Sequence, residues 1–316
     1  MVNENSGNKT FFFLSVAILI SMMGGIVFPS VGIIFEPYLL IWLGLLLFFN
    51  LIRLNTSDLL PVFTNPKNLL VLTAVKLFII PMALYVIMNY LVYPKPSMDT
   101  TLGIFLLSGI STGLGSPFVA NFVGSKLPII VGLVISTSFA VPFVLPVLVY
   151  LLFNSQFSIP ICDMVFLLSG ALLVPLAAGH IMKKYAVAVT QLMDKNSLVF
   201  SIVFIFLMNF GVFAEYSDYF IFDIDFVLEN ILIAFLLFGV YGFIGYVFAR
   251  LMGLNKNERI SIFIAMTWVN NMLVVVFAQQ FFNVHVAALS AFFNVPYYVG
   301  ILILKKTLAR GIPINS

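Results

Sequence analysis

The sequence predicts an all-α polytopic membrane protein. Of its 316 residues, 62% are hydrophobic and only 9% are charged, whereas a soluble chain carries roughly 25% charged residues. The mean hydropathy is +1.14, and apolar runs of about 20 residues, the length that crosses a bilayer as a helix, recur along the chain. Since a lipid-facing backbone must satisfy its own hydrogen bonds, each run is expected to be helical. The lipid bilayer is therefore an expected partner, and nucleic acid is not.

Ten apolar segments, bounded by charges or by clusters of Pro, Asn and Asp, are the predicted spans. The first is interpreted as a span rather than as a signal peptide, because no small-residue cleavage site of the A-x-A kind follows it. The segments centre on residues 11–27, 37–52, 68–91, 101–123, 127–153, 161–182, 196–213, 226–251, 260–282 and 284–304.

The loop charges predict the orientation of these spans. With a cytoplasmic N-terminus, all of the 15 Lys and Arg residues except Lys95 and Lys76 fall in cytoplasmic loops or tails. Lys95 lies in an outer loop, as does the acidic stretch "AEYSDYFIFDID". This asymmetry follows the positive-inside rule. We therefore expect a multi-pass protein of the cell (plasma) membrane with both termini in the cytoplasm.

The ten spans divide into two halves at the polar stretch 154–158. Residues 1–157 form a first five-helix repeat, and residues 158–316 form a second. Because five is an odd number, the second repeat is inverted relative to the first. In inverted-repeat transporters, corresponding interrupted spans of the two halves meet near the membrane midplane and form the substrate site.

The fourth span of each half carries the polar residues that such a site requires. The fourth span reads "LLSGISTGLGSPFVANFVG" and the ninth reads "FIAMTWVNNMLVVVF". Gly and Pro interrupt a helix, and the freed amides and carbonyls can bind ions where the break lines a cavity. Two other interpretations stay open: a close helix crossing of small residues, and interhelical hydrogen bonds made by the Asn pair. The candidate substrate- or ion-binding residues are Ser111, Thr112, Gly113, Gly115, Ser116, Pro117, Asn121, Ser136, Thr137, Thr267, Asn270 and Asn271, together with Lys76.

Lys76 lies inside the third span, in "VLTAVKLFIIPM". An ammonium at a span centre costs roughly 2.5–3.5 kcal/mol, so it should face the bundle interior or a watery cavity and have partners there. Snorkelling is disfavoured because Asn68, at the span end, is roughly 12 Å away along the helix. A retinal-type Schiff base is disfavoured because no Asp or Glu occupies a span centre.

Residues 35–81, "FEPYLLIWLGLLLFFNLIRLNTSDLLPVFTNPKNLLVLTAVKLFIIP", resemble the second and third spans of the bile acid:sodium symporter family. The shared features are the "LNTSD" element and the "NPK" entry to the third span. The resemblance implies a panel domain and a core domain, interleaved across both repeats, with unwound fourth and ninth helices that cross. The "NN" pair is also similar to the arsenite efflux permeases, but those use a cysteine in the fourth-span break, which here reads "GLGSP".

Two departures from the symporter pattern concern sodium. The sodium-coupled members carry a glutamine five residues before the third-span proline, where this chain has Lys76, and a glutamate before the ninth-span amide, which "AMTWVNN" lacks. A lysine and a sodium ion repel each other at short range. The resemblance therefore implies that Lys76 replaces the coupling cation. Because burial disfavours the charged form of an amine, proton coupling is an alternative to no coupling.

We expect a secondary active transporter of a small organic anion that works by alternating access, since half-helix N-termini and Lys76 offer positive potential. The alternatives are a sodium-coupled symporter of bile-acid-like or other organic anions, a metalloid or anion efflux permease, and a channel or non-transporting receptor. No set of catalytic or metal-ligating residues and no cofactor are expected. We therefore do not expect the protein to be an enzyme. The sequence carries no signal for an oligomeric state.

Overall fold

The computed structural model describes residues 4–53, 66–113, 115–125 and 127–309, and these residues form helices joined by short turns and breaks, without a strand. Among these described residues, six helices are long and apolar enough to cross a membrane, and a seventh span arises if the bent pair Val187–Asp194 and Val199–Glu215 counts as one. This confirms an all-helical membrane protein, while the ten-span inverted repeat stays a prediction. The six helices are Pro29–Asn50, Pro66–Leu91, Leu127–Phe153, Ile161–Tyr185, Ile224–Leu251 and Val284–Leu304.

The chain folds into two compact units, and each unit draws on both halves of the sequence. The first consists of Met1–Leu54 and Val174–Glu229, and the second consists of Asn55–Leu173 and Asn230–Ser316. Helices α10 (Ile161–Tyr185) and α13 (Ile224–Leu251) contribute to both units. The division into repeats 1–157 and 158–316, with interleaved panel and core domains, stays a prediction.

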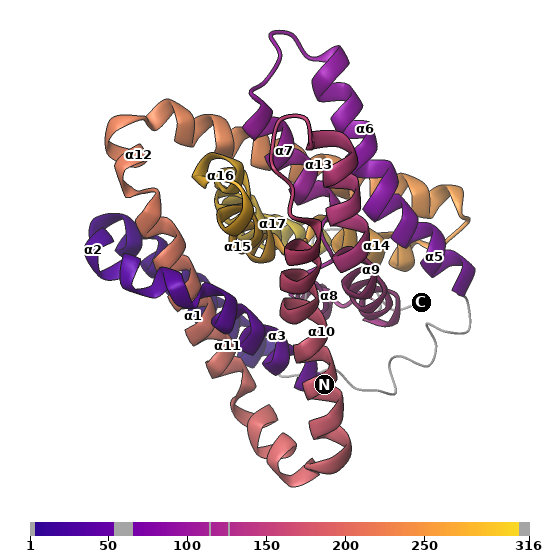
Figure 1. The fold of residues 1–316 in the computed structure, drawn as a ribbon. Helices are drawn as coiled ribbons and strands as arrows, with labels where there is room; N and C mark the ends of the chain where they lie inside the picture. Colours follow the sequence, from indigo (N-terminus) through magenta and orange to yellow (C-terminus); the bar gives the residue numbers. More distant parts are fainter. Residues whose placement is uncertain (1–3, 54–65, 114, 126, 310–316) are drawn as a thin grey trace. The chain divides into compact units, whose positions relative to one another are not determined.

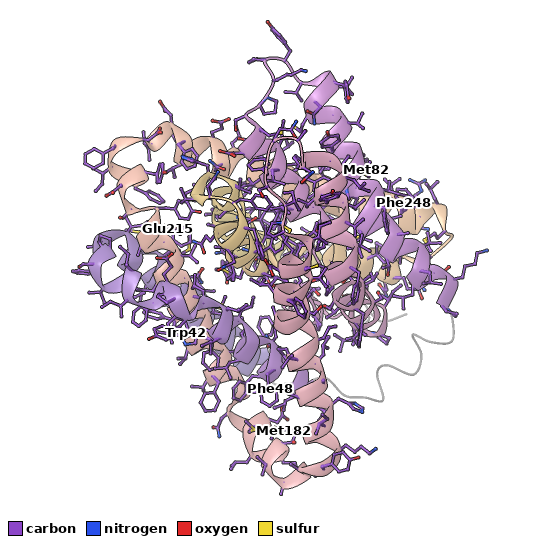
Figure 2. All side chains as sticks on the ribbon, viewed as in Figure 1. Trp42, Phe48, Met82, Met182, Glu215 and Phe248 are labelled. Atoms are coloured by element: carbon purple, nitrogen blue, oxygen red, sulfur yellow. The ribbon has the colours of Figure 1, made fainter. Side chains whose placement is uncertain are left out.

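In the first unit, α11 packs along its length against α1 and α3, and the three helices run side by side (Figure 1). A Cβ atom on Gly25 of α1 would lie 2.5 Å from the Phe210 carbonyl oxygen, so the close approach of α1 to α11 requires a glycine there. Aromatic rings also pack against each other in this unit. The ring centroid of Trp42, which is labelled in Figure 2, lies 5.5 Å from that of Phe35. The helices of this unit are α1 (Glu4–Val27), α2 (Pro29–Gly32), the 3₁₀ helix η1 (Ile33–Tyr38), α3 (Leu39–Arg53), α11 (Val187–Glu215) and α12 (Ser217–Phe222).

The second unit contains all the candidate site residues. Its central helix, α7, is buried on every side from Thr101 to Gly109, with α16 packed along it. Figure 1 shows α15, α16 and α17 gathered next to α7, and Figure 2 shows the side chains crowded between them. The other helices are α5 (Pro66–Ala74), the π-helices η3 (Val75–Ile79) and η4 (Ile87–Leu91), α6 (Ile80–Val86), α7 (Met98–Gly109), α8 (Ser116–Val123), α9 (Leu127–Phe153), α14 (Lys256–Thr267), α15 (Asn271–Phe281), α16 (Val284–Phe292) and α17 (Asn294–Ala309).

Lys76 lies on a π turn within the third apolar segment. The Ile80 N–H donates to the carbonyl of Val75, five residues back, instead of four. The widened turn accommodates Pro81, which has no N–H to donate and whose ring would clash with the carbonyl four residues earlier in a regular helix. The extra residue in this turn changes the direction in which the Lys76 side chain leaves the helix.

The fourth and ninth apolar segments are each divided into two helices. Helix α7 ends at Gly109 because Ile110 is extended, with ψ 163°. Helix α8 begins at Ser116, and Pro117 fits its first turn because the N–H that it lacks would have no partner there. Helices α14 and α15 are separated in the same way by residues 268–270.

Candidate functional site

The two broken helices cross at their breaks. Thr112 and Val269 form an isolated antiparallel bridge. The Gly113 N–H donates to the Trp268 carbonyl at 2.8 Å, and the Asn270 N–H donates to the Ser111 carbonyl at 3.0 Å. Backbone groups freed by one break are thus satisfied by the other, as burial in an apolar interior requires.

Gly113 is needed for this contact. A Cβ atom there would lie 2.7 Å from the Val269 carbonyl oxygen and 3.0 Å from that of Trp268. Both obstacles are backbone atoms, which cannot rotate away as a side chain could. The glycine in the fourth-span break therefore allows the backbones of the two breaks to touch.

The end of α14 is capped by side chains that come from other parts of the chain. A helix leaves its last carbonyls without intrahelical partners, and this end carries negative partial charge. The Ala265 carbonyl accepts from the Thr112 hydroxyl at 3.0 Å. The Met266 carbonyl accepts from Lys76 Nζ at 2.9 Å. The crossing and the buried lysine thus meet at the same helix terminus.

Lys76 is completely buried and does not snorkel. Besides the Met266 carbonyl, its ammonium faces the ring of Tyr241, with Nζ 5.2 Å from the ring centroid. Neither partner is an acid. A dipole and an aromatic face therefore hold this charge, and no carboxylate among the described residues pairs with it.

Helix α9 supports the crossing through Ser136 and Thr137. The Thr137 hydroxyl accepts from the Thr112 N–H at 3.0 Å and donates to the Leu133 carbonyl at 2.5 Å. Ser136 Oγ and Thr73 Oγ1 share a hydrogen bond of 2.8 Å, one helical turn before Lys76. Both α9 residues thus use their hydroxyls inside the protein.

The remaining residues of the fourth-span break differ in what they contact. The Ser116 hydroxyl donates to the Gly113 carbonyl at 2.6 Å, and Pro117 is buried next to it. The buried Ser111 hydroxyl has no hydrogen-bond partner among the residues that the structure describes. Gly115 lies against the Tyr297 hydroxyl of α17. Asn121 belongs to α8, but its side chain lies outside the described residues.

The two adjacent asparagines of the ninth-span break have different surroundings. The Asn271 side-chain amide donates to the Ser290 carbonyl at 3.0 Å and to Asn294 Oδ1 at 2.8 Å. The Asn270 side chain keeps 8% of its surface exposed and makes no hydrogen bond to any described residue. Thr267 Oγ1 is used locally, donating to the Phe263 carbonyl at 2.7 Å. Asn270 thus keeps some exposed surface at the break, whereas Asn271 joins α15 to α16 and α17.

Sequence reasoning missed the contributions of Tyr241, Tyr297 and Asn294. Tyr241 and Tyr297 are aromatic residues in apolar helices, of a kind frequent in this chain. The only local signal near Tyr241 is the pair Gly242 and Gly245, which indicates a close helix contact. Within the described part of the chain, no three or more His, Cys, Asp or Glu side chains lie together in a group that could hold a metal ion.

The model of the Sodium Bile acid symporter family matches residues 40–223. No curated protein matches the chain.

Proposed function

Because the chain belongs to the sodium bile acid symporter family, a family of membrane transporters, we propose that it is a secondary active transporter of a small organic anion. In this proposal it works by alternating access and without sodium, and Lys76 takes the place of the coupling cation. Its ten spans form two inverted five-helix repeats. It lies in the plasma membrane with both termini in the cytoplasm.

The observation that carries the proposal is the hydrogen bond from Lys76 Nζ to the Met266 carbonyl. This carbonyl belongs to the negative end of α14, where a cation is favoured. The ammonium supplies a positive charge at the crossing. A sodium ion held by the same carbonyl would lie next to that ammonium, and the two charges would repel each other strongly in a buried site.

The charge of Lys76, which no acid among the described residues compensates, supports an anionic substrate. The contacts of its ammonium are with a carbonyl and a ring, neither of which carries a full negative charge. The first turns of α8 and α15 start at the same crossing and add positive partial charge. An anion near the free amide of Asn270 would experience all three contributions. Since burial disfavours a charged amine, Lys76 could also exchange a proton between conformations, so coupling is to protons or absent.

A ligand screen tests the proposal. The purified protein would be heated with carboxylates, sulfonates and steroid conjugates, each in sodium chloride and in choline chloride, and the best ligand would then be followed into liposomes. We expect stabilisation and uptake that are equal in the two salts. Stabilisation of the unmodified protein by sodium, absent with potassium and choline, would overturn sodium independence. If no organic anion stabilises the protein or enters the liposomes, the proposed substrate class is wrong.

A pair of variants sharpens the test. Lys76→Gln with Met266→Glu supplies the two residue types that sodium-coupled relatives carry, and should gain stabilisation by sodium. Lys76→Gln alone is the matched control, and it should gain less because the ninth-span acid is still missing.

A further inference from the structure

Tyr241 of α13 is a fully buried residue that contacts the candidate site through its ring. Its centroid is 5.2 Å from Lys76 Nζ, within the range in which a cation is attracted to an aromatic face. Such an attraction is stronger where water is excluded, and the Lys76 side chain has no exposed surface.

Two glycines bring the ring to this position. A Cβ atom on Gly242 would lie 2.6 Å from Thr267 Oγ1, and one on Gly245 would lie 2.7 Å from Met266 Cγ. Helix α13 therefore approaches the last turn of α14 more closely than residues with side chains would allow. This is the turn whose carbonyl accepts from Lys76, so the close contact delivers the Tyr241 ring to the ammonium.

The ammonium has few other means of staying in place. The Lys76 side chain is long and flexible, and among the described residues Met266 alone accepts a hydrogen bond from it. One hydrogen bond fixes the ammonium on one side only. The ring of Tyr241 covers a second side of the charge.

We propose that Tyr241 is a positioning residue for the transport cycle: its ring and the Met266 carbonyl together hold the Lys76 ammonium at the end of α14. The inference rests on the proposed function, in which this charge replaces a coupling cation. Without the ring the ammonium can leave the carbonyl, and the crossing loses the charge that makes it independent of sodium.

A double-mutant cycle tests the contact in the absence of any ligand. The unfolding midpoint would be measured for Tyr241→Phe, Tyr241→Leu, Lys76→Met and the combination of Tyr241→Leu with Lys76→Met. Tyr241→Leu removes the ring and should lower the midpoint by about 3 °C. Tyr241→Phe keeps the ring and should leave the midpoint close to that of the unmodified protein. In the Lys76→Met background the same Leu substitution should have less than half of that effect, since interacting residues are not additive.

Phe238 provides a matched control on the same helix. Its ring packs on Trp268 and Phe293, at centroid distances of 5.0 and 5.8 Å. Phe238→Leu should therefore lower the midpoint equally in both backgrounds. Equal effects of Tyr241→Leu in both backgrounds would mean that Tyr241 only fills space, and would overturn the inference.

If Tyr241→Leu does not fold, fluorinated phenylalanines at position 241 replace it, because fluorine weakens the attraction for a cation at nearly constant shape. If the unfolding midpoint falls with each added fluorine when Lys76 is present, but not in the Lys76→Met background, the inference is supported. If the midpoint does not depend on fluorination, the inference is overturned. The cycle uses ligand-free protein. If the Tyr241 and Lys76 substitutions have additive effects on the midpoint, only the role of Tyr241 is refuted, and the proposed function is untouched. If Lys76 and Tyr241 are coupled but the protein takes up anions only with sodium, the proposed sodium independence is refuted instead.

Discussion

Lys76 shows how a buried charge can be tolerated without an acidic partner. Placing an ammonium at a span centre costs roughly 2.5–3.5 kcal/mol. Against this, a hydrogen bond to a charged group contributes about 1.5–3 kcal/mol, and a desolvated cation over an aromatic ring contributes about 2 kcal/mol. These magnitudes balance to within a few kcal/mol for the contacts with Met266 and Tyr241. The two contacts thus offset the cost of the buried charge without a carboxylate from the described part of the chain.

The two neighbouring asparagines should respond differently to substitution. Asn270→Leu removes a free amide and should weaken binding of the best screened anion by roughly 10-fold to 100-fold, with little change in the unfolding midpoint of the ligand-free protein. Asn271→Leu removes two hydrogen bonds and should lower the free energy of unfolding by about 1–3 kcal/mol. Thermal unfolding with and without the anion measures both effects.

Each variant serves as the control for the other, because both replace a buried amide of the same break by the same residue. If Asn270→Leu binds the anion with unchanged affinity, the exposed part of the crossing is not the binding surface. If Asn271→Leu is as stable as the unmodified protein, its contacts with Ser290 and Asn294 contribute nothing measurable.

How far the sequence predicted these residues depends on the range of the contact. Lys76 and the polar residues of both breaks were recognisable because each violates the apolar pattern locally. The partner of Lys76 was not, because 190 residues separate it from Met266. Nor could the sequence divide the roles of Asn270 and Asn271, since adjacent residues in an irregular segment point in different directions only once the backbone is known.

At the scale of elements, the crossing is a pair of broken helices whose freed backbone groups hydrogen-bond to each other. Gly and Pro in the fourth span, and the Asn pair in the ninth, predicted that both helices would be interrupted. The antiparallel bridge between Thr112 and Val269 could not be predicted, because it depends on how two distant segments pack. The π turn at Lys76 was missed, although Pro81, which the widened turn accommodates, is visible in the sequence.

The break between α7 and α8 yields a prediction about its glycines. Gly115→Ala would place a methyl group against the Tyr297 hydroxyl, and overpacking of this kind costs about 1–3 kcal/mol. Tyr297→Phe removes that hydroxyl and leaves the ring carbon 3.5 Å from the new methyl group, which is an ordinary contact. The combination of Gly115→Ala and Tyr297→Phe should therefore be more stable than Gly115→Ala alone, as measured by thermal unfolding.

Gly113 offers the contrasting case. The atoms that a methyl group would meet there belong to the backbone of Val269 and Trp268. Gly113→Ala should thus lower stability in the presence or absence of Tyr297→Phe. Rescue of both alanine variants by Tyr297→Phe would show that the hydroxyl acts on the whole break rather than on Gly115.

At the scale of the whole molecule, the family match covers only part of the candidate site. The family match covers residues 40–223, which include α7 and α8 but end before α14 and α15. The second half of the crossing is therefore assigned by its geometry. The two compact units also cut across the predicted repeats, because each unit takes helices from both sides of residue 157. Composition predicted the membrane class, but it could not reveal which helices pack together.

The orientation in the membrane is testable with single cysteines. The native Cys162 is exposed, so Cys162→Ser is the background. Lys95, Asp218 and Lys256 are exposed and suit replacement, whereas the neighbouring Ser217 is 5% exposed and would react poorly for reasons unrelated to topology. Since the positive-inside rule places Lys95 and Asp218 outside and Lys256 inside, an impermeant thiol reagent added to intact cells should label Lys95→Cys and Asp218→Cys. Lys256→Cys should be labelled only after the membrane is opened. The reverse pattern would invert the orientation, and labelling of Lys95→Cys and Lys256→Cys from the same side would contradict the number of spans between them.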